Sequence, residues 1–319
     1  MYRHFPSRWD GFIEFSPDQL SNAASNVPLS VDVLSAGGST SRIRQLQSPE
    51  GWALDTSYLN SHVRARGGFQ RGCVVVLMAT RPAEATICNV PLEPGIVLTI
   101  PDGQDIFASI KPGAAWTAAV LPTETWLDIE ETATRLSVDS TPNAPRAIRL
   151  SEQGLRYVGS RLAALPSRLG ENDAQREWRM PIAVSEYLGA IAEASLDRAL
   201  ADRQLDRSLT RRLAQAWKAD DFIRTHLSES LSVMRLCKEL RLSRRQLEYA
   251  FRTTFDISPA EYVLRTRLNE SRRKLRSARK TGQSVTDIAL ETGITHLGRF
   301  AGYYHRLFGE TPSDTARQR

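Results

Sequence analysis

Residues 236–259 read LCKELRLSRRQLEYAFRTTFDISP, and residues 288–312 read IALETGITHLGRFAGYYHRLFGETP. Apolar side chains occupy matching positions in the two stretches, 52 or 53 residues apart. The matched pairs are Leu236 and Ile288, Leu242 and Ile294, Phe251 and Tyr304, and Phe255 and Phe308. Each stretch therefore predicts the same unit, a short amphipathic helix, a tight turn and a longer second helix, which is the helix-turn-helix arrangement. We place the two motifs at about 233–255 and 285–308.

Residues with strong capping preferences mark the turn in each motif. Ser243 is followed three residues later by Gln246, a capping box that predicts a helix beginning at Arg244. In the second motif, Gly293 supplies the left-handed residue that ends a helix at about Thr292. Apolar residues then recur every four positions in both second helices, so one face of each is predicted to be core. The opposite face remains available for a partner.

The sequence between the motifs predicts a long basic helix. Ser258 is an N-cap residue, Pro259 stands at the first helical position, and Glu261 completes a capping box. The helix should run to about Ser277, and Gly282 should prevent it from continuing. Its basic residues are Arg265, Arg267, Arg272, Arg273, Lys274 and Arg276. A rigid helix can hold two second helices at a fixed separation, and adjacent major-groove faces of B-DNA lie about 34 Å apart.

Residues from Leu231 to Arg319 resemble the double helix-turn-helix domain of the AraC/XylS family of transcription regulators. The second motif carries the most specific part, namely GITHLGRFA at 293–301, Tyr304, FGE at 308–310 and PSDT at 312–315. It is similar to the XylS-like branch, which implies control of aromatic-acid catabolism, and the first motif also resembles regulators of ethanolamine utilisation. Asp256 and Ile294 depart from the family's usual glycine and phenylalanine. Aspartate tolerates a left-handed cap better than most residues, so the expected fold stands.

Charge is distributed unevenly along the chain. Residues 210–319 hold 22 Lys and Arg against 12 Asp and Glu, a balance of +10, whereas residues 1–209 hold 20 against 24, a balance of −4. The net +6 of the whole chain therefore combines a basic C-terminal part with a mildly acidic N-terminal part. Together with the repeated motif, the basic part indicates binding to a nucleic acid.

Composition is typical of a globular protein with two domains of ordinary size. No apolar run approaches the roughly 20 residues that span a bilayer, and no hydrophobic signal segment follows Met1, so we expect a cytoplasmic protein without membrane contact. The three cysteines, Cys73, Cys88 and Cys237, form no CxxC or Cys/His cluster. We expect reduced structural thiols and no metal or other cofactor.

Short segments rich in Val, Ile and Leu fill the region from about residue 50 to 137. They are Cys73–Met78, Glu84–Val90, Ile96–Ile100, Asp105–Ile110 and Trp116–Leu121, with Gly and Pro between them. This spacing predicts a small barrel or jelly roll, and the family resemblance implies a cupin-like barrel. The expected fold class is α+β in two domains: an N-terminal cupin-like β-barrel with following helices, and a C-terminal all-α domain of two helix-turn-helix motifs joined by a long linker helix.

Two amphipathic segments, about Glu152–Leu165 and Pro181–Arg203, follow a polar linker at 139–145. Their apolar stripes must be buried, either within the chain or in a homodimer contact, and both alternatives explain the pattern. We expect an effector-sensing and dimerisation domain at 1–205, with its helical part at about 148–205, a linker at 206–213, and the DNA-binding domain at 214–319.

Helical geometry predicts which side chains face DNA. In the first motif the outward positions are Arg244, Arg245, Glu248, Tyr249 and Arg252, and in the second they include His296, Arg299 and Tyr303. Arginine suits bidentate contact with guanine, and glutamate accepts from cytosine. The resemblance implies a base-contacting arginine where Gly302 stands, so we expect Arg299 to read the bases there. His296 has two interpretations, a phosphate contact or a structural role at the helix end.

Four aromatic residues, Trp52, Phe69, Phe107 and Trp116, are candidates to line an apolar effector cavity, although ordinary core packing explains each of them singly. The leading hypothesis is a sequence-specific transcriptional activator of a catabolic operon, controlled by a small-molecule effector, with promoter DNA and RNA polymerase as partners. An architectural DNA-binding protein with a non-sensing N-terminal module is the alternative. A metal-dependent cupin enzyme would need a His and carboxylate cluster, and only His62 lies near the predicted strands, so we expect no enzyme.

Overall fold

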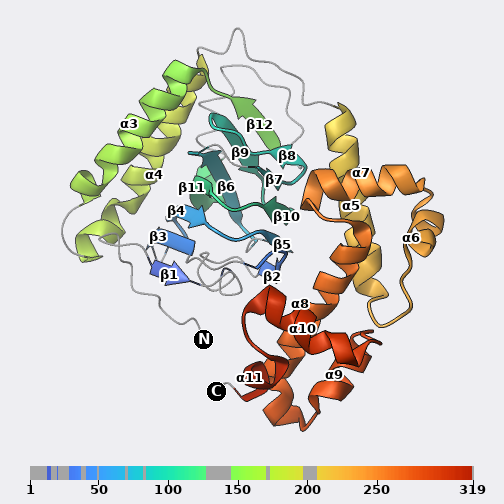
Figure 1. Ribbon diagram of the computed structural model, residues 1–319. Helices are drawn as coiled ribbons and strands as arrows, with labels where there is room; N and C mark the ends of the chain where they lie inside the picture. Colours follow the sequence, from blue (N-terminus) through green and yellow to red (C-terminus); the bar gives the residue numbers. More distant parts are fainter. Residues whose placement is uncertain are drawn as a thin grey trace. The chain divides into compact units, whose positions relative to one another are not determined.

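The computed structural model describes residues 13–15, 20, 29–36, 41–48, 50–68, 71–81, 84–126, 145–169, 173–196 and 207–317 (Figure 1). Contacts between residues divide the chain into two compact units. The first unit consists of Met1–Val31, Thr40–Asn60 and Ala65–Gln204. The second consists of Asp32–Ser39, Ser61–Arg64 and Leu205–Arg319. Two short N-terminal segments are therefore part of the same unit as the C-terminal helices.

The N-terminal strands form two sheets. The seven-stranded sheet has the order β1(Ile13–Phe15), β3(Ser41–Gln47), β4(Ala53–Leu59), β11(Ala114–Pro122), β6(Cys73–Ala79), β9(Ile96–Ile100) and β12(Arg146–Arg149). The five-stranded sheet has the order β2(Leu29–Val33), β5(Val63–Gly68), β10(Asp105–Ile110), β7(Ala85–Ile87) and β8(Val90–Pro91). Among the described strands, both sheets have two edges. A closed cupin-like barrel is therefore not confirmed, whereas a sheet-rich N-terminal region is.

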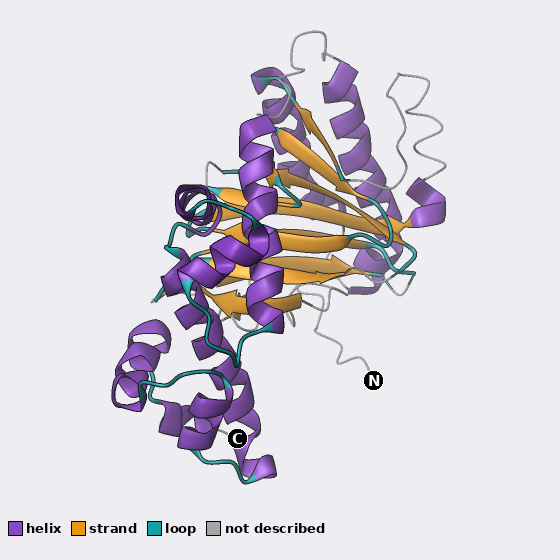
Figure 2. Ribbon diagram, turned by 90° about the vertical axis from the view of Figure 1, so that its right-hand side faces the viewer, coloured by secondary structure: helices purple, strands orange, loops and turns teal. Residues whose placement is uncertain are grey.

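Two helices cover one face of the seven-stranded sheet; they are labelled in Figure 1 and lie behind the strands in Figure 2. They are α3(Glu152–Leu169) and α4(Asp173–Leu196). The two helices pack against each other, and α4 packs against β3 and β4. Val184 and Tyr187 on α4 are fully buried against sheet residues such as Leu54. In the described part of the chain, apolar residues of both predicted stripes, such as Val158, Leu165 and Leu188, are buried within the chain. Helix α4 continues through Pro181, although a helix was predicted to begin there. Residues 197–203 of the second predicted segment lie outside the described residues.

One predicted strand is wrong. The segment Glu84–Val90 contains two short strands, β7 and β8, joined by Cys88 and Asn89, whose φ angles are 50° and 63°. Two consecutive residues with positive φ make the tight turn that suits a hairpin. Asn accepts this conformation readily, but Cys carries no turn signal, and so the sequence did not mark the reversal.

The second unit is helical in its C-terminal part. Its helices are α5(Arg207–Thr225), α6(Val233–Leu240), α7(Arg244–Phe255), α8(Pro259–Thr281), α9(Val285–Glu291), α10(Leu297–Phe308) and α11(Pro312–Arg317). Helix α5 begins inside the stretch for which a linker was predicted. Serine N-caps precede α6, α7, α8 and α9, and the predicted capping box of Ser243 and Gln246 is confirmed.

Aromatic side chains form the core around the first motif. Phe251 and Phe255 of α7 are fully buried, and Tyr262 of α8 packs its ring against both. Trp217 of α5 meets Phe255 edge-on, with ring centroids 5.2 Å apart. A second cluster joins the later part of α8 to α9 and α10 through residues such as Leu275, Ile288 and Phe300. Helix α8 therefore contributes to both cores.

No helix in the described parts of the chain is both long and apolar enough to cross a bilayer. Cys73, Cys88 and Cys237 are free thiols, as predicted. Burial raises the pKa of the Cys88 thiol to about 11.

Candidate nucleic-acid interface

The first motif is a pair of helices with a sharply defined turn. Helix α6 ends at Arg241, whose φ of 53° is left-handed, and Ser243 then caps α7 by accepting from the backbone N–H of Gln246. Helix α7 ends at Asp256, again left-handed at φ 56°. This residue replaces the glycine that the family resemblance implies, and it makes the same conformation. Both ends of α7 are thus fixed by local structure.

The outward face of α7 carries the five predicted side chains. Arg244, Arg245, Tyr249 and Arg252 are exposed, and Glu248 is half-buried. The guanidinium of Arg212 lies over the Tyr249 ring at 5.4 Å from its centroid. Arg252 donates to the carbonyl of Asp256 at 3.3 Å, so part of its guanidinium stabilises the end of the helix. Arg244 and Arg245 stand at the first turn of α7, where side chains can project toward a groove.

The second motif depends on the turn between α9 and α10. Gly293 has a φ of +82°, and a Cβ atom built there would lie 2.6 Å from the carbonyl oxygen of Leu227 and 2.9 Å from Nε of Arg267. Arg267 itself donates to the carbonyls of Leu227 and Glu229, at 3.1 and 2.6 Å. Only glycine fits this position, because both its conformation and the space around it exclude a side chain.

The outward residues of α10 differ from one another. His296 is the N-cap residue, but its side chain makes no capping hydrogen bond and is exposed. Arg299 is exposed between Gly298 and Gly302, and a Cβ at either glycine would meet nothing within 4 Å. Tyr303 is half-buried beneath the guanidinium of Arg306, which lies 4.8 Å from the ring centroid. Arg299 is therefore the long side chain best placed to extend from the early turns of α10.

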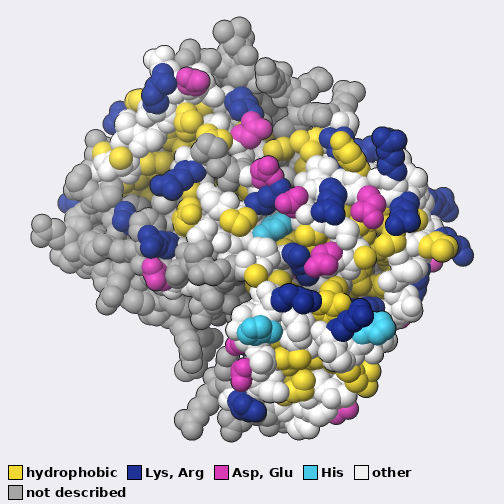
Figure 3. Space-filling model, in the orientation of Figure 1, with side chains coloured by type: hydrophobic (Ala, Val, Ile, Leu, Met, Phe, Trp, Pro, Cys, Tyr) yellow, Lys and Arg dark blue, Asp and Glu magenta, His cyan; other side chains and the backbone are white. Residues whose placement is uncertain are grey.

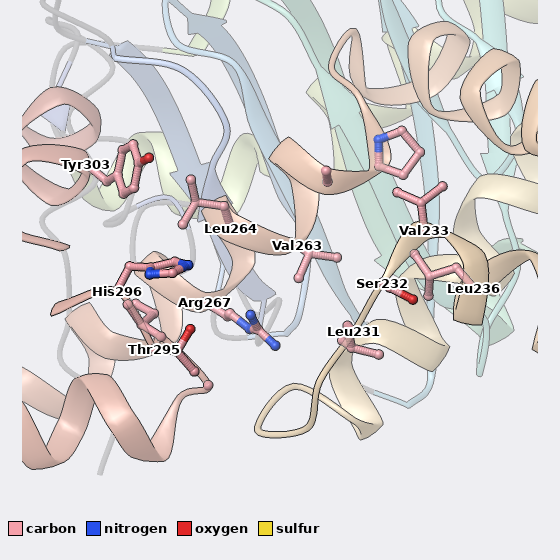
Figure 4. Close-up of a pocket in the computed structure, with 14 residues that line it drawn as sticks. Leu231, Ser232, Val233, Leu236, Val263, Leu264, Arg267, Thr295, His296 and Tyr303 are labelled. Carbon is pink, nitrogen blue, oxygen red and sulfur yellow. The ribbon is translucent and has the colours of Figure 1, made fainter. Parts of the chain in front are cut away.

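A cavity of about 240 Å³ separates the two motifs. In Figure 4, Thr295, His296 and Tyr303 lie on one side of it, and residues from Leu231 to Leu236 lie on the other. Helix α8 lies between them, with Val263, Leu264 and Arg267. The predicted site residues His296 and Tyr303 thus border this cavity as well as the outer face of α10.

Basic side chains are numerous on the second unit. In Figure 3 they gather over the area where Figure 1 places α5, α6 and α7. Arg306 was not among the predicted contacts, although it follows Arg299 by seven positions on the same helix and is exposed. That spacing of two helical turns is the signal that would have found it.

The predicted effector residues that the structure describes lie in different parts of the N-terminal sheets. Trp52 is buried in the core that joins the seven-stranded sheet to α3 and α4. Trp116 is half-buried on β11 of that sheet, and Phe107 is half-buried on β10 of the other sheet. Phe69 lies outside the described residues. In the parts of the chain that are described, no group of three His, Cys, Asp or Glu side chains is arranged to hold a metal ion.

Comparison with known proteins places the C-terminal helices in a family. Residues 236–318 match the family described as a helix-turn-helix domain. The XylDLEGF operon transcriptional activator of Pseudomonas putida is 31% identical over 147 residues, which cover 46% of this chain and 46% of the relative. The C-terminal region therefore matches a helix-turn-helix domain and is similar to an operon transcriptional activator.

The chain is also similar to other regulators. The probable thc operon regulatory protein of Rhodococcus erythropolis is 31% identical over 99 residues, 31% of this chain and 30% of that protein. The matched part of the chain thus spans less than half the length of these curated relatives. A regulator from Chromobacterium violaceum with a solved structure is 28% identical over 33% of this chain and 91% of its own, with a TM-score of 0.31. The AraC-like activator CuxR covers 88% of this chain at 14% identity, with a TM-score of 0.40 and all of its own length aligned.

Proposed function

We propose that this chain is a sequence-specific DNA-binding transcriptional regulator of the AraC/XylS type. The observation that carries the proposal is the presence of two helix-turn-helix motifs in one unit, α6–α7 and α9–α10, joined by the single helix α8. Each motif exposes polar residues on its second helix while the apolar face of that helix is buried. Such a pair can enter two successive major grooves on one side of a duplex.

Within this function, Arg244 and Arg245 of α7 and Arg299 of α10 contact bases, because they are exposed on the early turns of the two second helices. Glu248, Tyr249, Arg252, His296 and Tyr303 complete the surface that faces DNA. The exposed His296 side chain does not cap α10, which favours the phosphate contact over the structural role.

The N-terminal region acts as the regulatory part, at about residues 1–205, and the DNA-binding domain occupies about 214–319. We assign to the N-terminal region a cupin-like fold, a small-molecule effector site and a homodimer contact. Activation of a catabolic operon through RNA polymerase is the matching output, in a cytoplasmic protein. The support for activation comes from the relatives, since the protein of Pseudomonas putida is named an operon transcriptional activator.

Selection from a pool of random duplexes tests the central proposal. The full chain is mixed with the pool, bound duplexes are amplified over several rounds, and the affinity for the selected duplex is compared with that for a scrambled duplex of the same composition. We expect a ratio of about 10³ or more, as for sequence-specific regulators. Nearly equal affinities would instead identify an architectural DNA-binding protein and would overturn the proposal.

A further inference from the structure

A network of charged side chains lies within the second unit, and three of its members, Asp32, Arg64 and Asp220, are buried. Its members are Asp32, Arg64, Asp220, Arg224, Glu270 and Arg273. Two of them come from the short segments Asp32–Ser39 and Ser61–Arg64, and the other four come from α5 and α8. Three carboxylates therefore meet three guanidinium groups, so the network carries no net charge. Burying ions is costly unless such partners are present.

Asp32 is the centre of one half of the network. Its side chain is fully buried and pairs with Arg224 of α5 and Arg273 of α8, the latter at 2.7 Å. Burial alone would raise the pKa of Asp32, but the positive charges of Arg224, Arg273 and Arg64 outweigh burial and lower it. Asp32 is thus a carboxylate that joins two helices of the DNA-binding unit.

Asp220 of α5 is the centre of the other half. It pairs with Arg64 and with Arg224, whose Nε lies 2.8 Å from Oδ1. Tyr262 of α8 donates its hydroxyl to the same carboxylate at 2.6 Å. Arg64 is buried and lies over the Trp217 ring, 5.6 Å from its centroid. Helices α5 and α8 are therefore joined both directly and through the two N-terminal segments.

Val33 adds a contact that depends on the backbone. The side-chain amide of Asn269 accepts from the backbone N–H of Val33 and donates to its carbonyl oxygen, each at 2.9 Å. This paired contact recognises an extended peptide. The Val33 side chain is buried in the cluster that contains Leu268, Ile288 and Phe300, which is the core of the second motif.

The two adjacent residues Asp32 and Val33 thus reach both halves of the DNA-binding unit. Asp32 holds α5, which packs on the first motif through Trp217 and Phe255. Val33 packs into the second motif. Since α8 is the only covalent connection between the motifs, a segment that contacts both sides adds a second, noncovalent one.

We propose that the faces of α5 and α8 form a docking site for an extended acidic-apolar segment, that residues 32–33 occupy it, and that this docked segment fixes the separation of the two helix-turn-helix motifs. Asp32, Val33 and Asn269 are positioning residues, and none of them is required to touch DNA. A duplex with two half-sites requires that separation, whereas a duplex with one half-site does not. This inference rests on the proposed DNA-binding function.

The test uses the full chain and three duplexes: the one selected above, a version with about five base pairs inserted between the half-sites, which is half a turn of B-DNA, and a version with one half-site only. Asp32→Asn removes the central charge with little change in shape. Glu93→Gln is the matched control, since it also removes one carboxylate, from an exposed pair with Arg149 on the first unit. Both variants raise the net charge by one, so any general gain in attraction to DNA is the same in both.

We expect Asp32→Asn to lower the affinity for the two-site duplex on the order of tenfold, within the usual range of coupling between sites. The affinity of Asp32→Asn for the single half-site should not change. The affinity of the Glu93→Gln control should not change on any of the three duplexes. The inserted base pairs should lower the affinity of the unmodified chain, and they should lower the affinity of Asp32→Asn by a smaller factor. An equal loss on all three duplexes would indicate less folded protein, and no loss on the selected duplex would overturn the inference. If the wild-type chain selects no sequence, the proposed function fails instead.

Two further measurements cover the case in which Asp32→Asn does not fold. Asn269→Ala keeps every charge of the network and removes both hydrogen bonds to the Val33 backbone, together with the one that the Asn269 amide donates to the Arg265 carbonyl within α8. It should show the same selective loss. Hydrogen exchange of the unmodified chain should protect the Val33 amide as strongly as the amides of α8, because both belong to one cooperative unit. Exchange about 100-fold faster at Val33 than in α8 would show a segment that opens separately and would contradict a fixed connection.

Discussion

At the scale of single residues, Arg299 is the side chain on which we propose that base recognition by the second motif depends. It stands exposed between two glycines on α10, so no neighbouring long side chain at positions 298 or 302 substitutes for it. We expect Arg299→Ala to cost about 1–3 kcal/mol of binding free energy on the selected duplex and to relax the preference at one or two base pairs. Titration of labelled duplexes measures both effects.

The control for Arg299 is Arg317→Ala, which removes an exposed arginine that is paired with Asp314 on α11. It should change the affinity for the selected and scrambled duplexes little and equally. If Arg299→Ala also lowers both affinities by one common factor, Arg299 contacts phosphate and does not read the bases.

Gly293 provides a residue-scale prediction about stability. An alanine there would need a left-handed backbone, and its Cβ would collide with the carbonyl of Leu227, so we expect Gly293→Ala to cost at least about 2 kcal/mol of unfolding free energy. Gly302→Ala is the matched control, because the same methyl group meets open space within α10 and should stabilise the helix by about 0.4–1 kcal/mol. Urea unfolding monitored by circular dichroism compares the two. Similar changes in both variants would show that the turn tolerates a side chain.

At the scale of elements, prediction from sequence succeeded where the determining interaction is local. The helix beginning at Arg244 follows from Ser243 and Gln246, which are three positions apart and form the expected capping box. The hairpin at Cys88 and Asn89 was missed because only one of its two left-handed residues has a turn preference. The open sheets could not be foreseen either, since alternating strands predict a β fold without fixing which edges pair.

The sequence predicted the outward residues of α7 but not the contacts of residues 32–33 with the helices, because those contacts are nonlocal. The outward residues of α7 follow from helical periodicity, because each is placed by neighbours three or four positions away. Asp32 and Arg224, by contrast, are separated by 192 positions, and an isolated aspartate in a short strand carries no signal of its partner. The docking of residues 32–33 on the helices was therefore visible only in three dimensions.

The network of charged side chains between α5 and α8 predicts how the free energy of unfolding depends on pH. The pKa of Asp32 is lowered, despite burial, by its three arginine neighbours, so its contribution is fully present above the ordinary value of 3.8 and is lost as the pH falls below it. The pKa of Tyr262 is raised well above 10.0, by burial and by Asp220, so its neutral form is favoured and stability falls as the pH rises above 10.0. Unfolding free energies measured from pH 3 to 11 should form a plateau between these limits.

Two substitutions test which side chain causes the loss of stability at each end of this pH range. Asp32→Asn should reduce the loss of stability on the acid side, and Tyr262→Phe should reduce it on the alkaline side. Glu93→Gln, outside the network, should leave the shape of the profile unchanged. An acid limb that is identical in Asp32→Asn and in the unmodified chain would show that Asp32 is not bound as a carboxylate in the folded protein.

At the scale of the whole molecule, the division of charge predicts a strong dependence of DNA binding on salt. Residues 210–319 carry a balance of +10, and neutralising phosphates with Lys and Arg releases condensed counterions. With about 6–10 phosphate contacts, the affinity for the selected duplex should fall by about 10³–10⁵ between 50 and 200 mM salt. Fluorescence anisotropy at four or five salt concentrations gives the slope. A flat dependence would exclude phosphate contacts as the main source of affinity.

The effector hypothesis also concerns the whole molecule, because it requires that a ligand and DNA each change the affinity of the chain for the other. Any compound that binds the N-terminal region and regulates the chain must differ in affinity between two states of the protein, and DNA must then change its affinity by the same factor. A thermal-shift screen of small aromatic acids and amines on the full chain identifies candidates. At about 100 times its dissociation constant, a compound that binds only the folded chain should stabilise it by about 2.7 kcal/mol.

Each candidate is then tested for reciprocity. The dissociation constant of the selected duplex is measured with and without saturating compound, and that of the compound with and without saturating duplex; the two ratios should agree. The full chain is required for this experiment, because a fragment beginning near Leu209 would lack Asp32 and Arg64 and would leave Asp220, Arg224 and Arg273 without these partners. A compound that stabilises the protein but changes neither DNA affinity nor transcription in a reconstituted assay is a ligand and not an effector. If every stabilising compound behaves in this way, the N-terminal region serves assembly or solubility, and the effector hypothesis is wrong.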